Sequence, residues 1–352
     1  MRVQSPGWWP TKGDAARDAY VGRTGCAKCH ASQTASQQTS AMAQAATRAA
    51  DAEILRQHDH LALRLGPYNE EILTKGEKSV LTVSDETASL SADLLWAFGV
   101  GHMGQTYIYQ RNGSFHESQL SFYGSSQSLN ITPEHSLSIP GNLEDAAGRR
   151  LTPAEARRCF GCHTTASVAK DQFDPSVAEL GVTCEACHGP GANHAAAMKS
   201  GMREEGVAMI MNPRWLDPVD SVDFCGACHR TWEDVVANGF TGIGVYNVRF
   251  APYRLENSKC WRKPDARLTC VACHDPHQPL EHDAAAYDSH CLQCHVNQPG
   301  AKKNADHPGA ACRVSTKNCT TCHMPKIETT VQHSTFTDHW IRIVVPGQPY
   351  PN

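Results

Sequence analysis

Seven copies of one five-residue pattern constrain this chain more than any other feature. In each copy two cysteines stand two residues apart, and a histidine follows the second cysteine directly. The copies occupy residues 26–30, 159–163, 184–188, 225–229, 270–274, 291–295 and 319–323. C-x-x-C-H is the attachment pattern of c-type haem, whose iron the histidine binds. Paired C-x-x-C motifs also build zinc sites, but zinc does not require a histidine at that position. The pattern therefore predicts seven haem c groups.

The predicted cofactor contacts fall on the cysteines and histidines of these motifs. The haem-binding cysteines are Cys26, Cys29, Cys159, Cys162, Cys184, Cys187, Cys225, Cys228, Cys270, Cys273, Cys291, Cys294, Cys319 and Cys322. The proximal iron ligands are His30, His163, His188, His229, His274, His295 and His323.

The number of haems limits the architecture. With 352 residues, the chain has only about fifty for each haem, so apolar porphyrin faces must supply much of the core. The 26 glycines and 20 prolines favour loops over long regular elements. We expect a multihaem cytochrome c fold of mostly irregular loops and short α-helices wrapped around seven haems, plus a small β-rich insert.

The spacing of the motifs divides the chain into three parts. The first two motifs start 133 residues apart, whereas later ones start 21 to 45 residues apart. We therefore expect a first haem segment (1–50), a β-rich haem-poor insert (51–142) and a haem-dense block with six haems (143–352). Thr152, Pro153 and Glu155 predict the start of a helix that runs into Cys159. The strand-like runs of the insert are 61–65, 80–83, 105–110 and 118–123.

Cysteine usage and charge indicate where such a protein works. Two cysteines remain outside the motifs, Cys260 and Cys312, and in an oxidising compartment we expect them to form a disulfide; two buried free thiols are the alternative.

Haem c is attached outside the cytoplasm, so we expect a periplasmic or extracellular protein. Residues 1–20 contain no signal peptide, so the leader was removed or the true start lies upstream. No transmembrane segment is expected, and the net charge of −4 argues against nucleic acid as a partner.

The sixth ligand of each iron decides what a haem can do. A second histidine gives a closed electron-transfer haem, methionine raises its potential, and an open position can bind substrate. Twelve histidines remain after the proximal ligands are assigned, so every haem could have two histidines. The candidate distal ligands are His135, His194, His277, His333 and His339, then His60, His102 and His307, which have less local context, and Met42 as a possible sulfur ligand.

These motifs resemble those of a known group, the bacterial multihaem cytochromes c. Its lineage includes the tetrahaem cytochrome of ammonia oxidisers, pentahaem nitrite reductase and octahaem hydroxylamine oxidoreductase, and the likeness is greatest to exported doubled C-x-x-C-H cytochromes. The residues that carry it are Tyr20-Val21-Gly22, the segments 26–30, 181–191, 224–230 and 319–326, and Phe336-Thr337-Asp338-His339.

The resemblance implies that His194, after the Gly189-Pro190-Gly191 turn, binds a haem other than that of the preceding motif. The chain departs from the enzymes because it has no C-x-x-C-K motif. Where relatives often have Ser-x-His it has Ser40-Ala41-Met42, which leaves one haem with methionine, a substitute histidine or an open site.

Two functions fit these features, and no catalytic residue is assigned. The first is an electron-transfer protein, either a carrier or a subunit of a conductive filament, whose partners are redox proteins or copies of itself in a homo-oligomer. The alternative is an oxidoreductase with one open haem that acts on a nitrogen or sulfur compound. Its distal donors would be Arg230, Tyr246, Arg249 and Tyr253.

Overall fold

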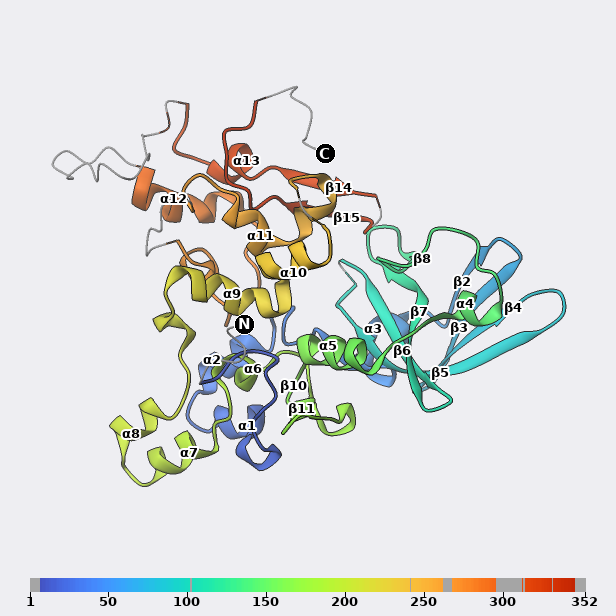
Figure 1. The fold of residues 1–352 in the computed structure, drawn as a ribbon, viewed down its shortest axis with the longest axis horizontal. Coiled ribbons are helices and arrows are strands. Elements are labelled where there is room, and N and C mark those ends of the chain that lie inside the picture. Colours follow the sequence, from blue (N-terminus) through green and yellow to red (C-terminus); the bar gives the residue numbers. More distant parts are fainter. Residues whose placement is uncertain are drawn as a thin grey trace. The chain divides into compact units, whose positions relative to one another are not determined.

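The computed structural model describes residues 7–101, 103–240, 242–261, 268–295, 312, 314–330 and 332–345 (Figure 1). The chain divides into two compact units. The sheet unit comprises Thr11–Ile210 and Thr330–Ser334, and the C-terminal unit comprises Met1–Pro10, Met211–Thr329 and Thr335–Asn352. Motifs one to three lie in the sheet unit, and motifs four to seven lie in the C-terminal unit.

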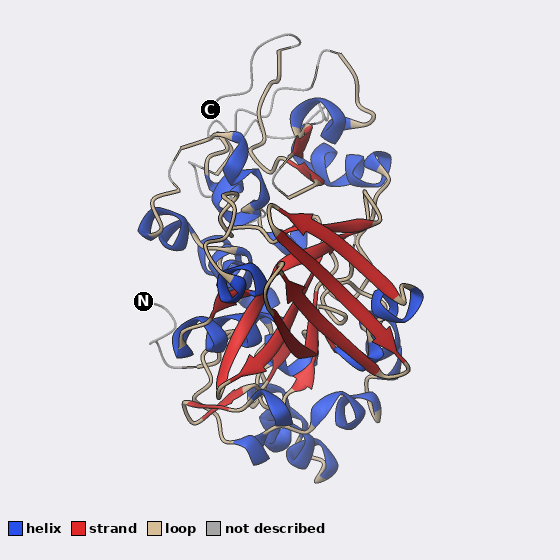
Figure 2. Cartoon of the chain, turned by 90° about the vertical axis from the view of Figure 1, so that its right-hand side faces the viewer, coloured by secondary structure: helices blue, strands red, loops and turns tan. Residues whose placement is uncertain are grey.

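A nine-stranded antiparallel sheet dominates the sheet unit (Figure 2). Seven strands follow one another in the order β2-β3-β4-β5-β6-β7-β8, while β1 pairs with β5 and β9 pairs with β7. Strands β2 and β8 also approach each other, so the row curls back on itself. The strands are β1 (Ala46–Arg48), β2 (His60–Leu65), β3 (Tyr68–Lys75), β4 (Lys78–Ser84), β5 (Ser89–Phe98), β6 (Gln105–Arg111), β7 (Ser114–Tyr123), β8 (Ser128–Ile131) and β9 (Gly148–Arg150).

The two faces of this sheet pack against different partners. One face encloses a core that includes Leu55, Ile72 and Leu81. A register shift between Leu94 and Trp96 inverts the alternation of side chains along β5, because an extra residue moves every later side chain to the other face. Trp96 and Phe98 therefore belong to a second cluster, with Phe160 of the helix that carries motif two.

The sheet covers more of the chain than the expected insert of residues 51–142. Its flanking strands β1 and β9 lie outside those limits, at residues 46–48 and 148–150. The fold is thus a mixed one of helices and strands, and the loop-rich fold class and three-part division stay predictions.

Among its described residues the sheet unit also has eight short α-helices and two small strand pairs. The helix expected at Thr152 is confirmed: Thr152 and Glu155 form a reciprocal capping box, and Pro153 is the first helical residue. The helices are α1 (Gly22–Ala27), α2 (Ala31–Gln37), α3 (Glu53–Gln57), α4 (Leu143–Ala147), α5 (Pro153–His163), α6 (Cys184–His188), α7 (Ala192–Lys199) and α8 (Arg203–Ala208). The small strands are β10 (Thr164–Thr165), β11 (Val168–Ala169), β12 (Gln172–Phe173) and β13 (Glu179–Leu180).

In its described residues the C-terminal unit has five α-helices and one small strand pair. Its helices are α9 (Pro218–His229), α10 (Trp232–Ala237), α11 (Ala251–Glu256), α12 (Asp288–His295) and α13 (Cys319–His323). Strands β14 (Lys326–Thr329) and β15 (Ser334–Thr337) pair with each other. Its described apolar core is small and centres on Val235, Phe250 and Tyr253. Among the helices of the described residues, none combines the length and the apolar character needed to cross a bilayer.

Candidate haem-binding sites

Every C-x-x-C-H motif lies on a helical turn. Helices α5, α6, α9, α12 and α13 each end at the histidine of a motif. In the first motif the amides of Cys29 and His30 donate to the carbonyl of Cys26 at 3.1 and 2.9 Å, and the fifth motif repeats this turn at Cys270. Residues i, i+3 and i+4 of a helical turn share one face. Each motif therefore presents two thiols and one imidazole on the same side, which is the donor set that haem c requires.

The accessibility of the thiols fits the same cofactor. All fourteen motif cysteines are at least partly accessible, and none is fully buried. Cysteine is among the residue types most often found fully buried, so fourteen accessible thiols are unusual. Their exposure leaves room for a porphyrin edge at each motif.

Contacts between first cysteines bring motifs together in pairs. The sulfurs of Cys26 and Cys184 lie in close contact, although 158 residues separate them. The thiols of Cys225 and Cys270 make a second such contact. In the C-terminal unit the last two motifs are joined in the same way, through Cys291 and Cys319. Haems attached at these positions would lie next to each other in pairs.

The imidazoles of His30 and His194 lie at the separation that two ligands of one iron would have. Their ring centres are 6.3 Å apart, and the ring planes differ by 23°. With imidazole nitrogen–metal bonds of about 2.0 Å on both sides, the two ring centres fall roughly 6 Å apart. Nδ1 of His194 donates to the carbonyl of Gly206 at 2.8 Å, which leaves Nε2 for the metal. His194 is thus placed opposite the proximal histidine of motif one, while it follows motif three in the sequence.

His274 and His339 form a second pair at a similar separation, with a larger angle between the rings. Their ring centres are 6.2 Å apart, with 43° between the planes. Nδ1 of His339 donates to the carbonyl of Thr337 at 3.0 Å. Burial lowers the pKa of His339 to about 4, so its ring is neutral near pH 7 and can offer a nitrogen lone pair.

Backbone carbonyls orient two further proximal imidazoles. Nδ1 of His163 donates to the carbonyl of Ala45 at 2.9 Å, and Nδ1 of His323 donates to that of Arg342 at 2.8 Å. Such bonds fix the tautomer and the plane of a ligating histidine. The ring of Phe98 also lies parallel to His163, 4.7 Å away with 11° between the planes.

The segment that contains Met42 contacts two residues that lie between motifs two and three in the sequence, Gly181 and Val182. The carbonyl of Met42 accepts from the amide of Val182 at 2.8 Å, and Gly181 passes so close to Ala43 that a side chain on it would strike the carbonyl of Ala43. The thioether of Met42 is half-buried. These contacts place the segment beside the haem sites, and sulfur ligation by Met42 stays a prediction.

His135 has both ring nitrogens engaged within the sheet unit. Nδ1 lies 2.8 Å from Oε1 of Gln119, and Nε2 lies 3.0 Å from Oε2 of Glu117. The side chain is only 2% exposed. Iron ligation by His135 would therefore require at least one of these bonds to break.

The remaining candidate ligands lie in less defined surroundings. His277 pairs with Asp275 at 3.3 Å, and His60 pairs with Glu71 at 3.4 Å, all with exposed side chains. His102 and His307 lie outside the described residues. Their roles as distal ligands stay predictions.

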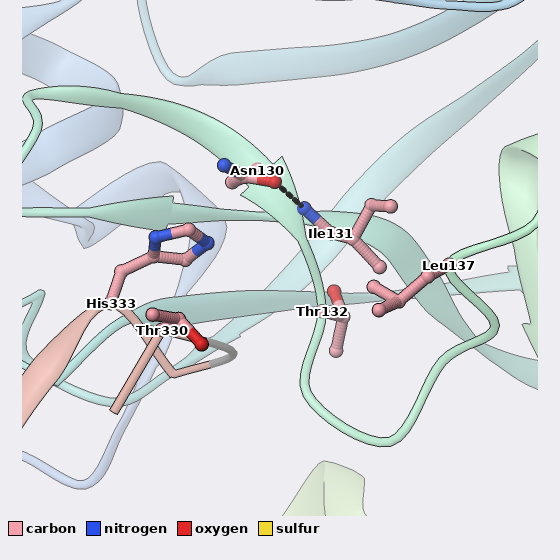
Figure 3. Close-up of a pocket in the computed structure, with 6 residues that line it drawn as sticks. All are labelled: Asn130, Ile131, Thr132, Leu137, Thr330 and His333. Atoms are coloured by element: carbon pink, nitrogen blue, oxygen red, sulfur yellow. Dashed lines mark hydrogen bonds between the residues drawn. The ribbon is translucent and has the colours of Figure 1, made fainter.

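His333 lines a pocket of about 240 Å³ in the sheet unit (Figure 3). Its backbone adopts a left-handed conformation (φ 46°), and its carbonyl accepts from the hydroxyl of Ser125 at 2.7 Å. The ring packs edge-on against Tyr123, 4.7 Å between centres. The other residues that line the pocket are Asn130, Ile131, Thr132, Leu137 and Thr330. The histidine is held in place there by its backbone and by Tyr123.

Three of the four donors nominated for an open haem, Tyr246, Arg249 and Tyr253, are engaged with one another or with the main chain. The hydroxyl of Tyr253 donates to the carbonyl of Gly242 at 2.9 Å. The guanidinium of Arg249 lies over the ring of Tyr246 and hydrogen-bonds its hydroxyl at 3.1 Å. Arg230 follows the last residue of α9 and has a positive backbone φ of 72°. The contacts of Tyr246, Arg249 and Tyr253 give these three side chains structural roles.

The two cysteines outside the motifs differ in their surroundings. Cys260 is half-buried just beyond α11, whereas Cys312 is exposed and its sulfur accepts from the amide of Val314 at 3.5 Å. Their disulfide stays a prediction.

Together the thiol-bearing turns and the facing imidazoles define a protein class, the multihaem cytochromes of the c type. Comparisons with known proteins agree with that class. Residues 114–189, which include motifs two and three, match the family described as "Cytochrome c554 and c-prime". The multiheme cytochrome MtrA of Shewanella baltica (strain OS185) is 25% identical over 215 residues, which are 51% of this chain and 64% of that protein. The chain thus matches less than two thirds of the relative's length.

A solved structure has a similar fold. The outer cell wall cytochrome OcwA superposes with a TM-score of 0.53 over 93% of this chain and 80% of that one, at 14% identity. The lineage expected from the sequence is supported at the level of multihaem c-type cytochromes. Sequence reasoning did not identify the carbonyl partners of the imidazoles, Ala45, Gly206 and Arg342, because main-chain groups leave no signal in a sequence.

Proposed function

We propose that this protein carries electrons along seven covalently bound haem c groups, most of them with two histidine ligands. The observation that carries the proposal is the pair of imidazole arrangements His30–His194 and His274–His339, at 6.3 and 6.2 Å. An iron held between two imidazoles has no open position, so it exchanges electrons without binding a substrate.

The contacts between motifs support conduction along the chain of haems. Cys26 meets Cys184, Cys225 meets Cys270, and Cys291 meets Cys319. The second cysteine of motif five, Cys273, also lies near enough to Cys291 to interact electrostatically. Motifs four to seven therefore form a continuous series, in which the protein fixes spacing and excludes water.

We place this activity outside the cytoplasm, in the periplasm or at the cell exterior. Covalent haem attachment and the name of the outer cell wall cytochrome support that location. Redox proteins, or further copies of this chain in an oligomer or filament, would receive the electrons. The net charge of −4, made more negative by haem propionates, favours partners with a positive docking surface.

The alternative is an oxidoreductase that uses one open haem. For His163 and His323 the described residues bring no second imidazole to the distance seen in the two pairs. Motifs two and seven are therefore candidates for an open iron. Phe98 beside His163 makes motif two the more enclosed of these sites.

Three measurements on the purified holoprotein test the proposal. Intact mass and pyridine haemochrome absorbance count the haems, and seven are expected. Electron paramagnetic resonance of the oxidised protein should show low-spin ferric signals for every haem. A high-spin ferric signal that shifts when nitrite or hydroxylamine is added would replace electron transfer by the enzymatic alternative.

A further inference from the structure

A buried carboxylate in motif three joins the two segments that supply ligands to the haem of motif one. Glu185 is the first residue after Cys184, and it is only 2% exposed. Its Oε1 accepts from the amides of Val21 at 2.9 Å and Gly191 at 2.8 Å. Its Oε2 accepts from the amide of Gly22 at 2.8 Å. The carboxylate thus bonds to two segments that lie far from each other in the sequence.

Each of these amides stands at the start of a helix that leads to a haem ligand. Val21 and Gly22 begin α1, which carries Cys26 toward His30. Gly191 precedes α7, whose third residue is His194. The first amides of a helix have no partner within it, so a carboxylate that accepts three of them satisfies donors that would otherwise be buried alone.

The packing around Gly191 shows how close this approach is. A side chain on Gly191 would lie 3.3 Å from Oε1 of Glu185 and 3.3 Å from Cγ2 of Val21. A methyl group at this position would therefore require one of these neighbours to shift by a few tenths of an ångström.

We propose that Glu185 is a positioning residue that sets the separation of His30 and His194, the two axial ligands of the haem at motif one. It acts from motif three, whose first thiol touches that of motif one. This inference rests on the proposed assignment of both imidazoles to one iron, 6.3 Å apart by ring centre. Without the carboxylate, α1 and α7 are no longer tied to a common point, and His194 can withdraw from the iron.

The test compares oxidised holoprotein variants by electron paramagnetic resonance and haem content. Glu185→Ala should convert one low-spin haem to a high-spin signal, while the other haems keep their spectra. Glu185→Gln should lie between Glu185→Ala and the wild type, because one amide oxygen can still accept two of the three bonds. The matched control is Glu179→Gln, since Glu179 accepts from the amide of Arg23 and the hydroxyl of Thr183 but not from α7.

Two further variants keep the outcome decisive. His194→Ala should give the same high-spin haem as Glu185→Ala; if it leaves every haem low-spin, the ligand assignment is wrong. A fully loaded Glu185→Ala protein with an unchanged low-spin spectrum, beside a His194→Ala protein that has turned high-spin, would overturn the role of Glu185. If Glu185→Ala does not assemble, Glu185→Gln and Gly191→Ala decide together: each should alter the spectrum of one haem, and unchanged spectra in both fully loaded variants would refute the proposal.

Discussion

The imidazole of His339 faces that of His274 at 6.2 Å, although 65 residues separate them in the chain. The segment that brings them together is anchored by the residue before His339. Asp338 is completely buried and forms a two-point ion pair with Arg254, at 2.8 and 2.9 Å, and a third bond with Arg342 at 2.6 Å. Arg342 in turn offers its carbonyl to His323 of motif seven. One short segment therefore positions two imidazoles, those of His339 and His323, which we propose as ligands of two haems.

Replacing Asp338 by asparagine should destabilise the C-terminal unit strongly. The change removes the negative charge from an ion pair whose two side chains are fully buried, and the loss of one partner from a buried pair costs about 3–5 kcal/mol. Denaturant unfolding of the holoprotein, followed by circular dichroism and Soret absorbance, measures the free energy. Asp171→Asn is the matched control: its pair with Arg157 is exposed, so the expected loss is about 0–1 kcal/mol. Equal losses of unfolding free energy in both variants would show that the buried pair contributes no more to stability than the exposed pair.

Changing His339 should affect the haem of motif five alone. His339→Ala opens one axial position, so one low-spin ferric signal should become high-spin. His339→Met should keep that haem low-spin and raise its reduction potential, because methionine ligation favours the ferrous state. Redox titration followed by absorbance measures the shift. His282→Ala, which alters an exposed histidine, should change neither spectrum nor potential. A His339→Met protein with unaltered potentials would contradict the ligand pairing.

The sequence was sufficient where the signal is local. The motif residues, and the helix start at Thr152, follow from spacings of a few residues, and the structure has that helix as expected. It was insufficient where the signal depends on distant contacts. The meeting of Cys26 with Cys184 and the bonds of Glu185 join segments about 160 residues apart, and no local pattern encodes them. The register shift at Trp96, which turns Phe98 toward motif two, is equally invisible in the alternation of residues.

Phe98 should affect both the orientation of the His163 imidazole and the folding stability of the protein. Phe98→Leu keeps most of the apolar volume, so the cost is roughly 1 kcal/mol, but it removes the flat surface against which the imidazole lies. We expect the g values of one haem to shift in electron paramagnetic resonance. Phe115→Leu is the matched control, because Phe115 belongs to the same cluster and packs against Trp96 and Phe160. The proposal for Phe98 fails if both variants leave all g values unchanged.

A buried acid inside the sheet unit gives a prediction that does not involve haem. Glu70 lies on β3 between Tyr68 and Ile72, facing the core, and its side chain is fully buried. Within the described part of the chain, neither carboxylate oxygen has a hydrogen-bond partner. Burial raises the pKa of Glu70 from 4.5 to about 8, because the charged form loses its hydration.

The stability of the wild-type protein should therefore fall, relative to Glu70→Gln, as pH rises. The folded state binds the proton of Glu70 more tightly than the unfolded state does. The resulting stabilisation of the folded wild type is complete below pH 4.5 and is lost as pH rises through about 8. A shift of this size corresponds to about 4–5 kcal/mol at most. Unfolding free energies of both proteins, measured between about pH 5 and about pH 9, give the difference. Glu86→Gln, at an exposed turn position, should follow the wild type throughout. If the difference in unfolding free energy between wild type and Glu70→Gln does not change with pH, Glu70 keeps an ordinary pKa in the folded protein.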